Sequence, residues 1–317
     1  MSAPPQFIFY VQGGALAGMG HIARSASLID VLEAQGHSCQ VVLRTDAEGH
    51  TFAKHRGLTV KEIELTDFLE PEASVVLDAI AIPHMDAALL SRMRRRILIS
   101  PVCNRADIAT AVLVRFAPKK LLNQTSDCCT IIQDERFANV TTADLVAKSL
   151  SYEDLTIGVC LSAGSAQKDI DELVKAAAIA PRVNEVRVIH PEAPRVEQAQ
   201  KTILHRAFCH DPWSFLSSVN VFVGGDGVMI AEAVAQGLPC LSVNRPENPN
   251  KNQFLADVGC IRVCTYDEAP RAVAAMVSDR SGLAAMHQAA RSSNSSQNVN
   301  ALADAITGLL EIEKVKG

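Results

Sequence analysis

Short, almost continuously apolar segments recur along this chain of 317 residues, and segments with helical periodicity separate them. They lack the strict alternation of a strand with one solvated face, so they predict parallel strands that are buried on both faces. Strands that alternate with helices form a parallel sheet with helices on both sides. The predicted strands are 7–11, 39–45, 59–65, 75–80, 96–100 and 111–116 in the first half, and 155–161, 185–190, 202–208, 219–223, 240–244 and 261–265 in the second.

The strand pattern weakens between residues 118 and 153, where polar residues accumulate, and this change places a domain boundary near residue 150. We therefore predict one Rossmann-like domain at 1–150 and a second at 151–317. Two such domains that face each other leave a cleft lined by the carboxyl ends of their strands, where ligands bind in α/β folds. The chain ends in an amphipathic pattern through Leu302, Ile306 and Leu309, and the sequence leaves open which domain that helix covers.

Composition restricts the partners and the compartment. With 30 basic and 35 acidic residues, the net charge of −5 argues against binding to nucleic acid. No apolar stretch is long enough to cross a bilayer, and the first residues show no signal-peptide pattern. The nine cysteines are odd in number and lack the spacing of metal ligands. We expect a reduced, cytoplasmic protein without a metal site, and the oligomeric state is left open.

A glycine-rich segment that ends in a histidine follows the first predicted strand: Gly14, then Gly18-x-Gly20-His21-x-x-Arg24. Glycines at a strand-to-helix turn let a ligand approach the backbone, and the helix N-terminus behind them favours negative charge. The histidine adds a group that can exchange a proton near neutral pH. We predict that the glycines shape a ligand site with His21 as its catalytic group. Arg24 either contacts a phosphate or pairs with an acidic residue of the first domain.

A second glycine turn, Gly224-Gly225-Asp226-Gly227, lies between a predicted strand and a helical pattern. Its backbone N–H groups suit a diphosphate, and Glu232, about two turns into the helix, is placed to accept hydrogen bonds from sugar hydroxyls. Asn252-Gln253 opens a further helix with side-chain amides that both donate and accept. Each feature also has an ordinary interpretation, Asp226 as a helix cap and Glu232 as a surface residue. Their joint occurrence favours a binding site.

The chain resembles the UDP-sugar hydrolases of pseudaminic-acid and related nonulosonic-acid biosynthesis at two motifs, Gly18-x-Gly20-His21-x-x-Arg24 and Gly224-Gly225…Glu232…Gly237-Leu238-Pro239…Asn252-Gln253. More broadly it is similar to GT-B glycosyltransferases such as the peptidoglycan GlcNAc transferase. The likeness in pattern runs over most of the chain. It implies a GT-B-like fold of two Rossmann-type parallel-sheet domains that face an interdomain cleft.

The resemblance implies that the second domain binds UDP. The segment around His210 then lies near the base, Glu232 contacts the ribose, and the turn at 224–227 meets the diphosphate. A small-residue turn that contains Gly164 follows the first strand of this domain and belongs to the same binding site.

In the first domain, the resemblance makes His21 the base for a water molecule that attacks the anomeric carbon. UDP and the free amino sugar are released with inversion, and neither a metal nor a cofactor is needed, because backbone amides stabilise the diphosphate. Asp78, at the end of a predicted strand, either orients His21 or binds a sugar hydroxyl.

Two positions depart from the pattern of the hydrolases. An Asp-His-Tyr-like segment is Asp78-Ala79-Ile80 here, and Ser100-Pro101 replaces a pair of aspartates. Three interpretations stay open. The chain is a UDP-sugar hydrolase, or a GT-B glycosyltransferase in which an acceptor hydroxyl replaces water, or a nucleotide-sugar-binding protein that lost catalysis with the aspartate pair.

Overall fold

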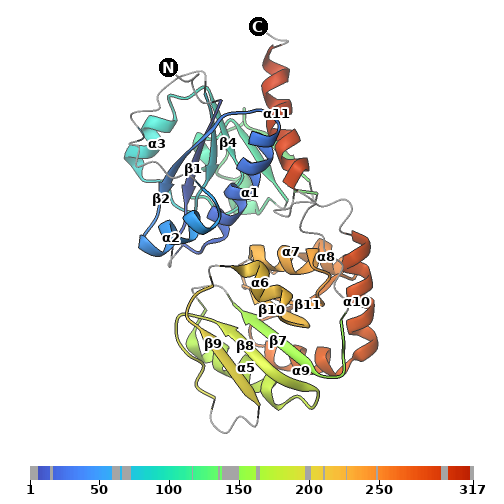
Figure 1. The fold of residues 1–317 in the computed structure, drawn as a ribbon. Coiled ribbons are helices and arrows are strands. Elements are labelled where there is room, and N and C mark those ends of the chain that lie inside the picture. The colour runs from blue at the N-terminus through green and yellow to red at the C-terminus, as the bar shows by residue number, and fades with distance from the viewer. Residues whose placement is uncertain are drawn as a thin grey trace. The chain divides into compact units, whose positions relative to one another are not determined.

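The computed structural model describes residues 6–14, 17–58, 65, 73–115, 117–134, 136–137, 150–161, 165–196, 201–209, 211–225, 227–247, 249–293 and 299–314. The chain forms two compact units, of which the first comprises Met1–Thr141 with Gln297–Gly317 and the second comprises Thr142–Ser296 (Figure 1). Within the described ranges, no helix combines the length and the apolar character that crossing a membrane requires.

The first unit contains a six-stranded sheet in which every described pair of neighbouring strands is parallel, in the order β2-β1-β3-β4-β5-β6. Both β1 and β3 are almost entirely buried, as the apolar runs predict. The chain leaves β1 for β2 on one side and reaches β3 on the other, so the strand order reverses between β1 and β3. The strands are β1 (Phe7–Gln12), β2 (Cys39–Arg44), β3 (Ser74–Asp78), β4 (Arg95–Leu98), β5 (Ala111–Val114) and β6 (Thr130–Gln133).

Helices cover both faces of this sheet. The long helices α1 (Gly20–Ala34) and α11 (Val299–Lys314) lie side by side, in blue and red in Figure 1, and Gln35 Nε2 donates a hydrogen bond of 3.2 Å to Asp304 Oδ1. On the other face, α3 (His84–Leu90) packs its Ala87 and Leu90 against Tyr10 of β1 in one apolar cluster. The shorter elements are α2 (Ala47–His55), the 3-10 turn η2 (Ala106–Ile108) and α4 (Lys119–Leu122).

The second unit repeats this architecture. Its parallel strands follow the order β12-β11-β10-β7-β8-β9, and the strand order reverses between β7 and β10. One apolar cluster joins the sheet to α5 and α9, and a second joins it to α7 and α10. The strands are β7 (Leu155–Cys160), β8 (Val183–Ile189), β9 (Thr202–Arg206), β10 (Val221–Gly225), β11 (Cys240–Asn244) and β12 (Ile261–Thr265). The helices are α5 (Gln167–Ile179), α6 (Pro212–Ser217), α7 (Val228–Ala235), α8 (Gln253–Asp257), α9 (Ala269–Ser278) and α10 (Arg280–Ser293).

The predicted α/β fold with two parallel sheets is confirmed, and eleven of the twelve predicted strands coincide with observed strands within a few residues. Most of the predicted strand at 59–65 lies outside the described residues. The edge strand β6 was not predicted, because three of its four residues are exposed and no apolar run marks it.

The units divide the chain differently from the expected boundaries of 1–150 and 151–317. The last segment, Gln297–Gly317, belongs to the first unit, so the second unit ends at Ser296. The reason is packing: Val299, Leu302 and Ile306 of α11 are buried, and α11 lies against α1 and β5. Because α11 returns to the first sheet, the first unit consists of two segments of the chain, and one boundary in the sequence cannot divide the two units.

Candidate functional site

The glycine turn after β1 depends on the absence of side chains. Gly14 and Gly18 have φ values of +128° and +80°, which favour glycine, and the Gly18 N–H donates to the Gly14 carbonyl at 2.8 Å. A Cβ atom on Gly14 would lie 2.6 Å from Oδ2 of Asp46, the residue that caps α2. A Cβ on Gly18 would meet nothing within 4 Å. The turn is therefore closed and tight at Gly14 and open around Gly18.

Helix α1 begins directly after this turn, at Gly20, with no side-chain cap on its first N–H groups. His21, Arg24 and Ser25 lie three and four positions apart, so they share one face of the first turns of the helix. That face is directed at β3, because all three side chains contact its last residue, Asp78.

Asp78 is completely buried at the carboxyl end of β3 and accepts hydrogen bonds on both carboxylate oxygens. His21 Nδ1 lies 2.6 Å from Oδ1. Arg24 binds the carboxylate as a fork, with Nε 2.9 Å from Oδ2 and Nη2 donating to Oδ1. Ser25 Oγ donates to Oδ2 at 3.1 Å. Of the two alternatives predicted for Arg24, a phosphate contact or a pair with an acidic residue of its own domain, the structure contains the pair.

The charge state of Asp78 results from two opposed effects. Burial raises the pKa of the Asp78 carboxyl, but the Arg24 guanidinium and the His21 ring beside it lower that pKa by more. The net pKa lies well below the ordinary aspartate value. Asp78 is therefore an anion at neutral pH, although no water reaches its side chain.

This geometry assigns the two nitrogens of His21 to different tasks. An ionised carboxylate only accepts hydrogen bonds, so a contact of 2.6 Å places the proton on Nδ1. In the neutral form of the ring, the other nitrogen, Nε2, carries the lone pair. The His21 side chain is 11% exposed, so it is not completely buried as Asp78 is. A neutral imidazole whose Nδ1–H is held by a buried carboxylate has the arrangement of a general base.

The segment after Asp78 is fixed by side chains that the sequence analysis did not single out. Gln12, the last residue of β1, accepts the backbone N–H groups of Ile80 and Ala81 at 3.0 and 2.8 Å. Asn104 Oδ1 accepts the N–H of Ile82 at 2.9 Å. Gln12 therefore connects the end of β1 to the end of β3, next to the dyad of His21 and Asp78. Its place directly after the predicted strand at 7–11 was the available signal.

The place where the hydrolases carry paired aspartates holds no acidic group here. Ser100, which follows β4, is completely buried, and its Oγ has no hydrogen-bond partner among the described residues. Cys103 lies near Asp78, and burial, with the charge of Asp78 among the further causes, raises the pKa of its thiol. Asp78 is thus the acidic residue that contacts His21 at this sheet edge.

In the second unit, the glycines at 224 and 227 act differently. Gly224 is buried in β10, and a Cβ there would lie 2.5 Å from the Phe222 ring. Gly227 precedes α7 with extended backbone, and a Cβ there would meet nothing within 4 Å. No side chain caps the N-terminus of α7 within the described residues. Among the described residues, no side chain thus competes with an anion for the first N–H groups of α7, whereas Gly224 is a packing requirement.

Glu232 is 6% exposed, so its interpretation as a surface residue of α7 is wrong. Its charge acts on Cys160, the last residue of β7, and on Cys209, which follows β9. Burial raises the pKa of the Cys160 thiol to about 12, and Cys209 and Glu232 contribute to the shift. The register pairs Cys160 with Gly224 of β10. Glu232 thus lies at the carboxyl edge of the sheet, where the strand order reverses and α/β proteins bind ligands.

The structure gives Asn252 and Gln253 partners inside the second unit. Asn252 adopts a left-handed conformation with φ of 67°, and its amide donates to Ser242 Oγ at 3.2 Å. Gln253 Nε2 donates to Asp257 at 2.9 Å on the exposed side of α8. Gly164, His210 and Asp226 lie outside the described residues, so their assignment to the site stays a prediction.

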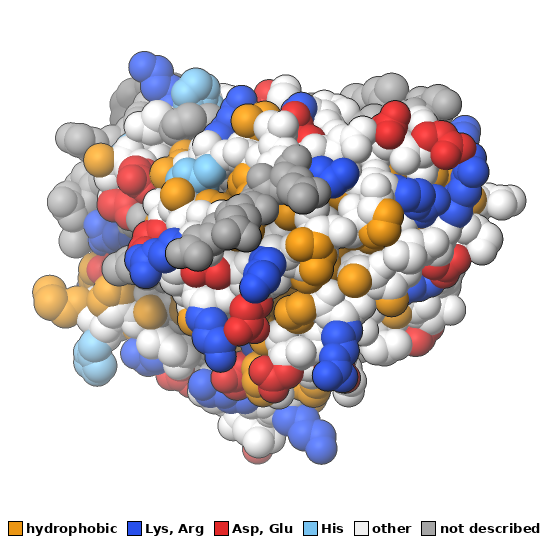
Figure 2. Space-filling model, turned by 90° about the horizontal axis from the view of Figure 1, so that it is seen from below, with side chains coloured by type: hydrophobic (Ala, Val, Ile, Leu, Met, Phe, Trp, Pro, Cys, Tyr) orange, Lys and Arg blue, Asp and Glu red, His pale blue; other side chains and the backbone are white. Residues whose placement is uncertain are grey.

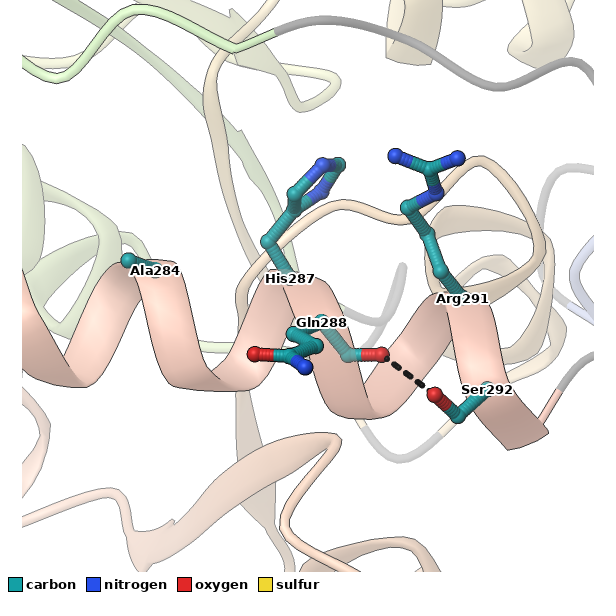
Figure 3. A pocket seen from close by; sticks show the side chains of 5 residues that line it. All are labelled: Ala284, His287, Gln288, Arg291 and Ser292. Carbon is teal, nitrogen blue, oxygen red and sulfur yellow. Dashed lines mark hydrogen bonds between the residues drawn. The ribbon is translucent and has the colours of Figure 1, made fainter.

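A hollow on α10 contains none of the predicted site residues. It is lined by Ala284, His287, Gln288, Arg291 and Ser292 (Figure 3). His287 Nδ1 lies 2.5 Å from the carbonyl of Gly237, in the turn that joins α7 to β11. His287 thus fixes α10 on the far end of α7. On the face seen in Figure 2, basic and acidic side chains are interspersed, in line with the small net charge.

The described residues contain no cluster of three side chains suited to a metal ion. The two reversal points, by contrast, hold most of the predicted residues that the structure describes. The glycine turn and the dyad of His21 and Asp78 lie where the strand order reverses between the neighbours β1 and β3. Gly225 and Glu232 lie where it reverses between the neighbours β7 and β10.

No protein-family model matches the sequence, and no curated protein matches it significantly. Solved structures share its fold at low identity. S. aureus MnaA, solved with UDP, is 12% identical with a TM-score of 0.64, over 96% of this chain and 97% of that one. Anabaena HepE, solved with UDP and glucose, is 12% identical with a TM-score of 0.64, over 97% and 99%. MurG from Acinetobacter baumannii is 14% identical with a TM-score of 0.58, over 96% and 100%. With its two six-stranded parallel sheets, the chain has the GT-B fold.

Replacing Asp78 by Asn should destabilise the protein by about 3–5 kcal/mol, because it leaves the buried guanidinium of Arg24 without a counter-charge. Urea unfolding of the wild type and Asp78→Asn measures this difference. Because the pKa of Asp78 is lowered in the folded state, its contribution is present at neutral pH and declines as the pH falls below about 4. The difference between the two proteins should therefore shrink in acid.

Asp107→Asn is the matched control, since Asp107 receives a similar Arg105 fork but is 54% exposed. It should cost at most about 1 kcal/mol. Equal losses in the two variants would contradict the assignment of Asp78 as a buried anion.

Proposed function

We propose that this protein is a nucleotide-sugar hydrolase that cleaves the anomeric C–O bond of a UDP-amino sugar and releases UDP and the free sugar. The observation that carries the proposal is the contact of 2.6 Å between His21 Nδ1 and the buried Asp78 carboxylate. It leaves His21 Nε2 as a base at the carboxyl edge of the first sheet. The resemblance of the two motifs to hydrolases of nonulosonic-acid biosynthesis supports the same chemistry.

The reaction needs one base and one stabilised leaving group. A water oxygen attacks the anomeric carbon on the side opposite to the diphosphate, and His21 Nε2 accepts a proton from that water. The anomeric C–O bond breaks, and its electron pair leaves with UDP, so the configuration at the anomeric carbon inverts. Asp78 stabilises the imidazolium that forms, because its anion remains hydrogen-bonded to Nδ1.

The second unit would supply the nucleotide site. Support comes from the N-terminus of α7 after Gly227, which no described side chain caps and which suits a diphosphate, and from the buried carboxylate of Glu232 at the same sheet edge. The MnaA and HepE structures of the same fold were solved with UDP. We assign the diphosphate to the α7 N-terminus and the ribose hydroxyls to Glu232.

Glycosyl transfer is the second candidate, because solved structures with this fold include the forosaminyltransferase SpnP at a TM-score of 0.59. The same dyad would then take its proton from an acceptor hydroxyl instead of water. Two neutral side chains at the position of the aspartate pair, Ser100 and Pro101, distinguish this chain from the hydrolase pattern. The two reactions differ in whether an acceptor is needed.

Purified protein should release UDP from a UDP-amino sugar when no acceptor is added. His21→Ala should lower this rate about 10²–10⁴-fold, the usual contribution of a general base. His50→Ala, an exposed histidine on α2 of the same unit, is the matched control and should keep the wild-type rate. UDP release can be followed by coupled assay over a panel of UDP-sugars. Binding of a UDP-sugar without release in the wild type would contradict hydrolysis and leave transfer or binding alone.

Glu232→Gln should raise the Kd for UDP about 10–100-fold, because a hydrogen bond to a charged group contributes about 1.5–3 kcal/mol. The substitution keeps the shape of the side chain and removes its charge. Calorimetric titration with UDP measures the change. Glu172→Gln on α5, where the side chain is 54% exposed, serves as the control of equal charge. An unchanged Kd in Glu232→Gln would rule out its contact with the nucleotide.

A further inference from the structure

Arg24 lies against both members of the dyad. Its Nη2 donates to Asp78 Oδ1 and its Nε lies 2.9 Å from Asp78 Oδ2. Nη2 also lies 3.1 Å from His21 Nδ1; when Nδ1 carries a proton, both atoms are donors that share Oδ1 and do not bond each other. The side chain of Arg24 is only 15% exposed. A phosphate-binding arginine would keep its fork directed at the ligand, whereas the fork of Arg24 is directed at a buried carboxylate.

We propose that Arg24 is a positioning residue that acts through Asp78 to keep the ring proton of His21 on Nδ1 and the Nε2 lone pair free. The effect of this role of Arg24 on turnover rests on the proposed hydrolase function. Its effect on the histidine tautomer does not, because that effect follows from the contacts among the three side chains.

The charge of Asp78 determines which atom of the dyad donates. An ionised carboxylate can only accept, so His21 Nδ1 must donate to it. A neutral carboxyl group can donate its own proton to Nδ1. The ring proton would then reside on Nε2, and the lone pair that accepts the proton of water would be lost. Burial favours this neutral carboxyl, and the adjacent guanidinium opposes it.

Arg24 also orients Asp78. The planar fork of Arg24 holds both oxygens of Asp78 at once, and Ser25 Oγ adds a contact of 3.1 Å to Oδ2. The carboxylate plane cannot rotate without breaking these contacts, so Oδ1 stays directed at His21 Nδ1. A lysine at position 24 would retain the positive charge but not the fork.

The experiment compares the wild type with Arg24→Gln by 15N NMR of the histidine rings at about pH 8.5, where an ordinary imidazole is neutral. His21 is assigned by its absence from His21→Ala. The wild type should show the proton on Nδ1, and Arg24→Gln should show a substantial population with the proton on Nε2. A wild type with the proton on Nε2, or an unchanged Nδ1–H pattern in Arg24→Gln, would overturn the proposal.

Arg44→Gln is the matched control, because Arg44 forms a similar fork with Asp86 in the same unit but does not contact His21. Its His21 spectrum should equal that of the wild type. A shift to the Nε2–H pattern in Arg44→Gln as large as in Arg24→Gln would overturn the specific role of Arg24.

Kinetics separate positioning from phosphate binding. Arg24→Gln should lower kcat about 10²-fold with KM within about twofold, because the base is impaired and the substrate contacts remain. A raised KM with unchanged kcat would instead identify a phosphate contact and overturn the proposal. If Arg24→Gln does not fold, Arg24→Lys provides the test: it should keep the Nδ1–H pattern and lose kcat rather than KM. Wild-type protein that releases no UDP would overturn the hydrolase function alone, since the spectra still decide the role of Arg24.

Discussion

A single buried carboxylate organises the candidate catalytic half of this protein. Asp78 terminates β3 without any exposure to solvent, and a buried anion is tolerated only when it is paired and hydrogen-bonded. One helix supplies all of these partners: His21, Arg24 and Ser25 project from the first turns of α1. The requirement to satisfy Asp78 therefore fixes the position of α1 against β3, and the same contacts hold Nδ1 of His21 against the carboxylate.

The two units use the same position in the fold for different chemistry. In each sheet the strand order reverses once next to the first strand of the unit, and the helices that follow begin at glycine turns. At the first reversal His21 contacts the buried Asp78 carboxylate, and at the second the N-terminus of α7, which no described side chain caps, accompanies the buried Glu232. The reaction proposed above assigns the diphosphate to the second unit and the base to the first.

The fold was predictable from the sequence because its strands are buried on both faces; the strand at Cys240–Asn244 has the predicted bounds. Strand β6 was not predicted, because its residues are mostly exposed and form no apolar run. For the site, the glycine turn and His21 were recognisable from local spacing, and Asp78 from its place at a strand end. The contacts among them were not, since His21 and Asp78 are 57 residues apart and only the β1–β3 pairing brings them together. Gln12 and Ser25 were missed because their roles depend on partners in a distant segment.

The central claim is that Asp78 is an anion held by Arg24 and His21 inside the protein. A 13C NMR titration of the aspartate side-chain carboxyls measures this charge directly, with the signal of Asp78 assigned by its absence from the spectrum of Asp78→Asn. The account predicts that this signal stays in its ionised form through and below the ordinary aspartate range near about pH 4. Protonation of Asp78 within or above that range would contradict the account, because neither the Nδ1–H tautomer of His21 nor its role as a base would then follow.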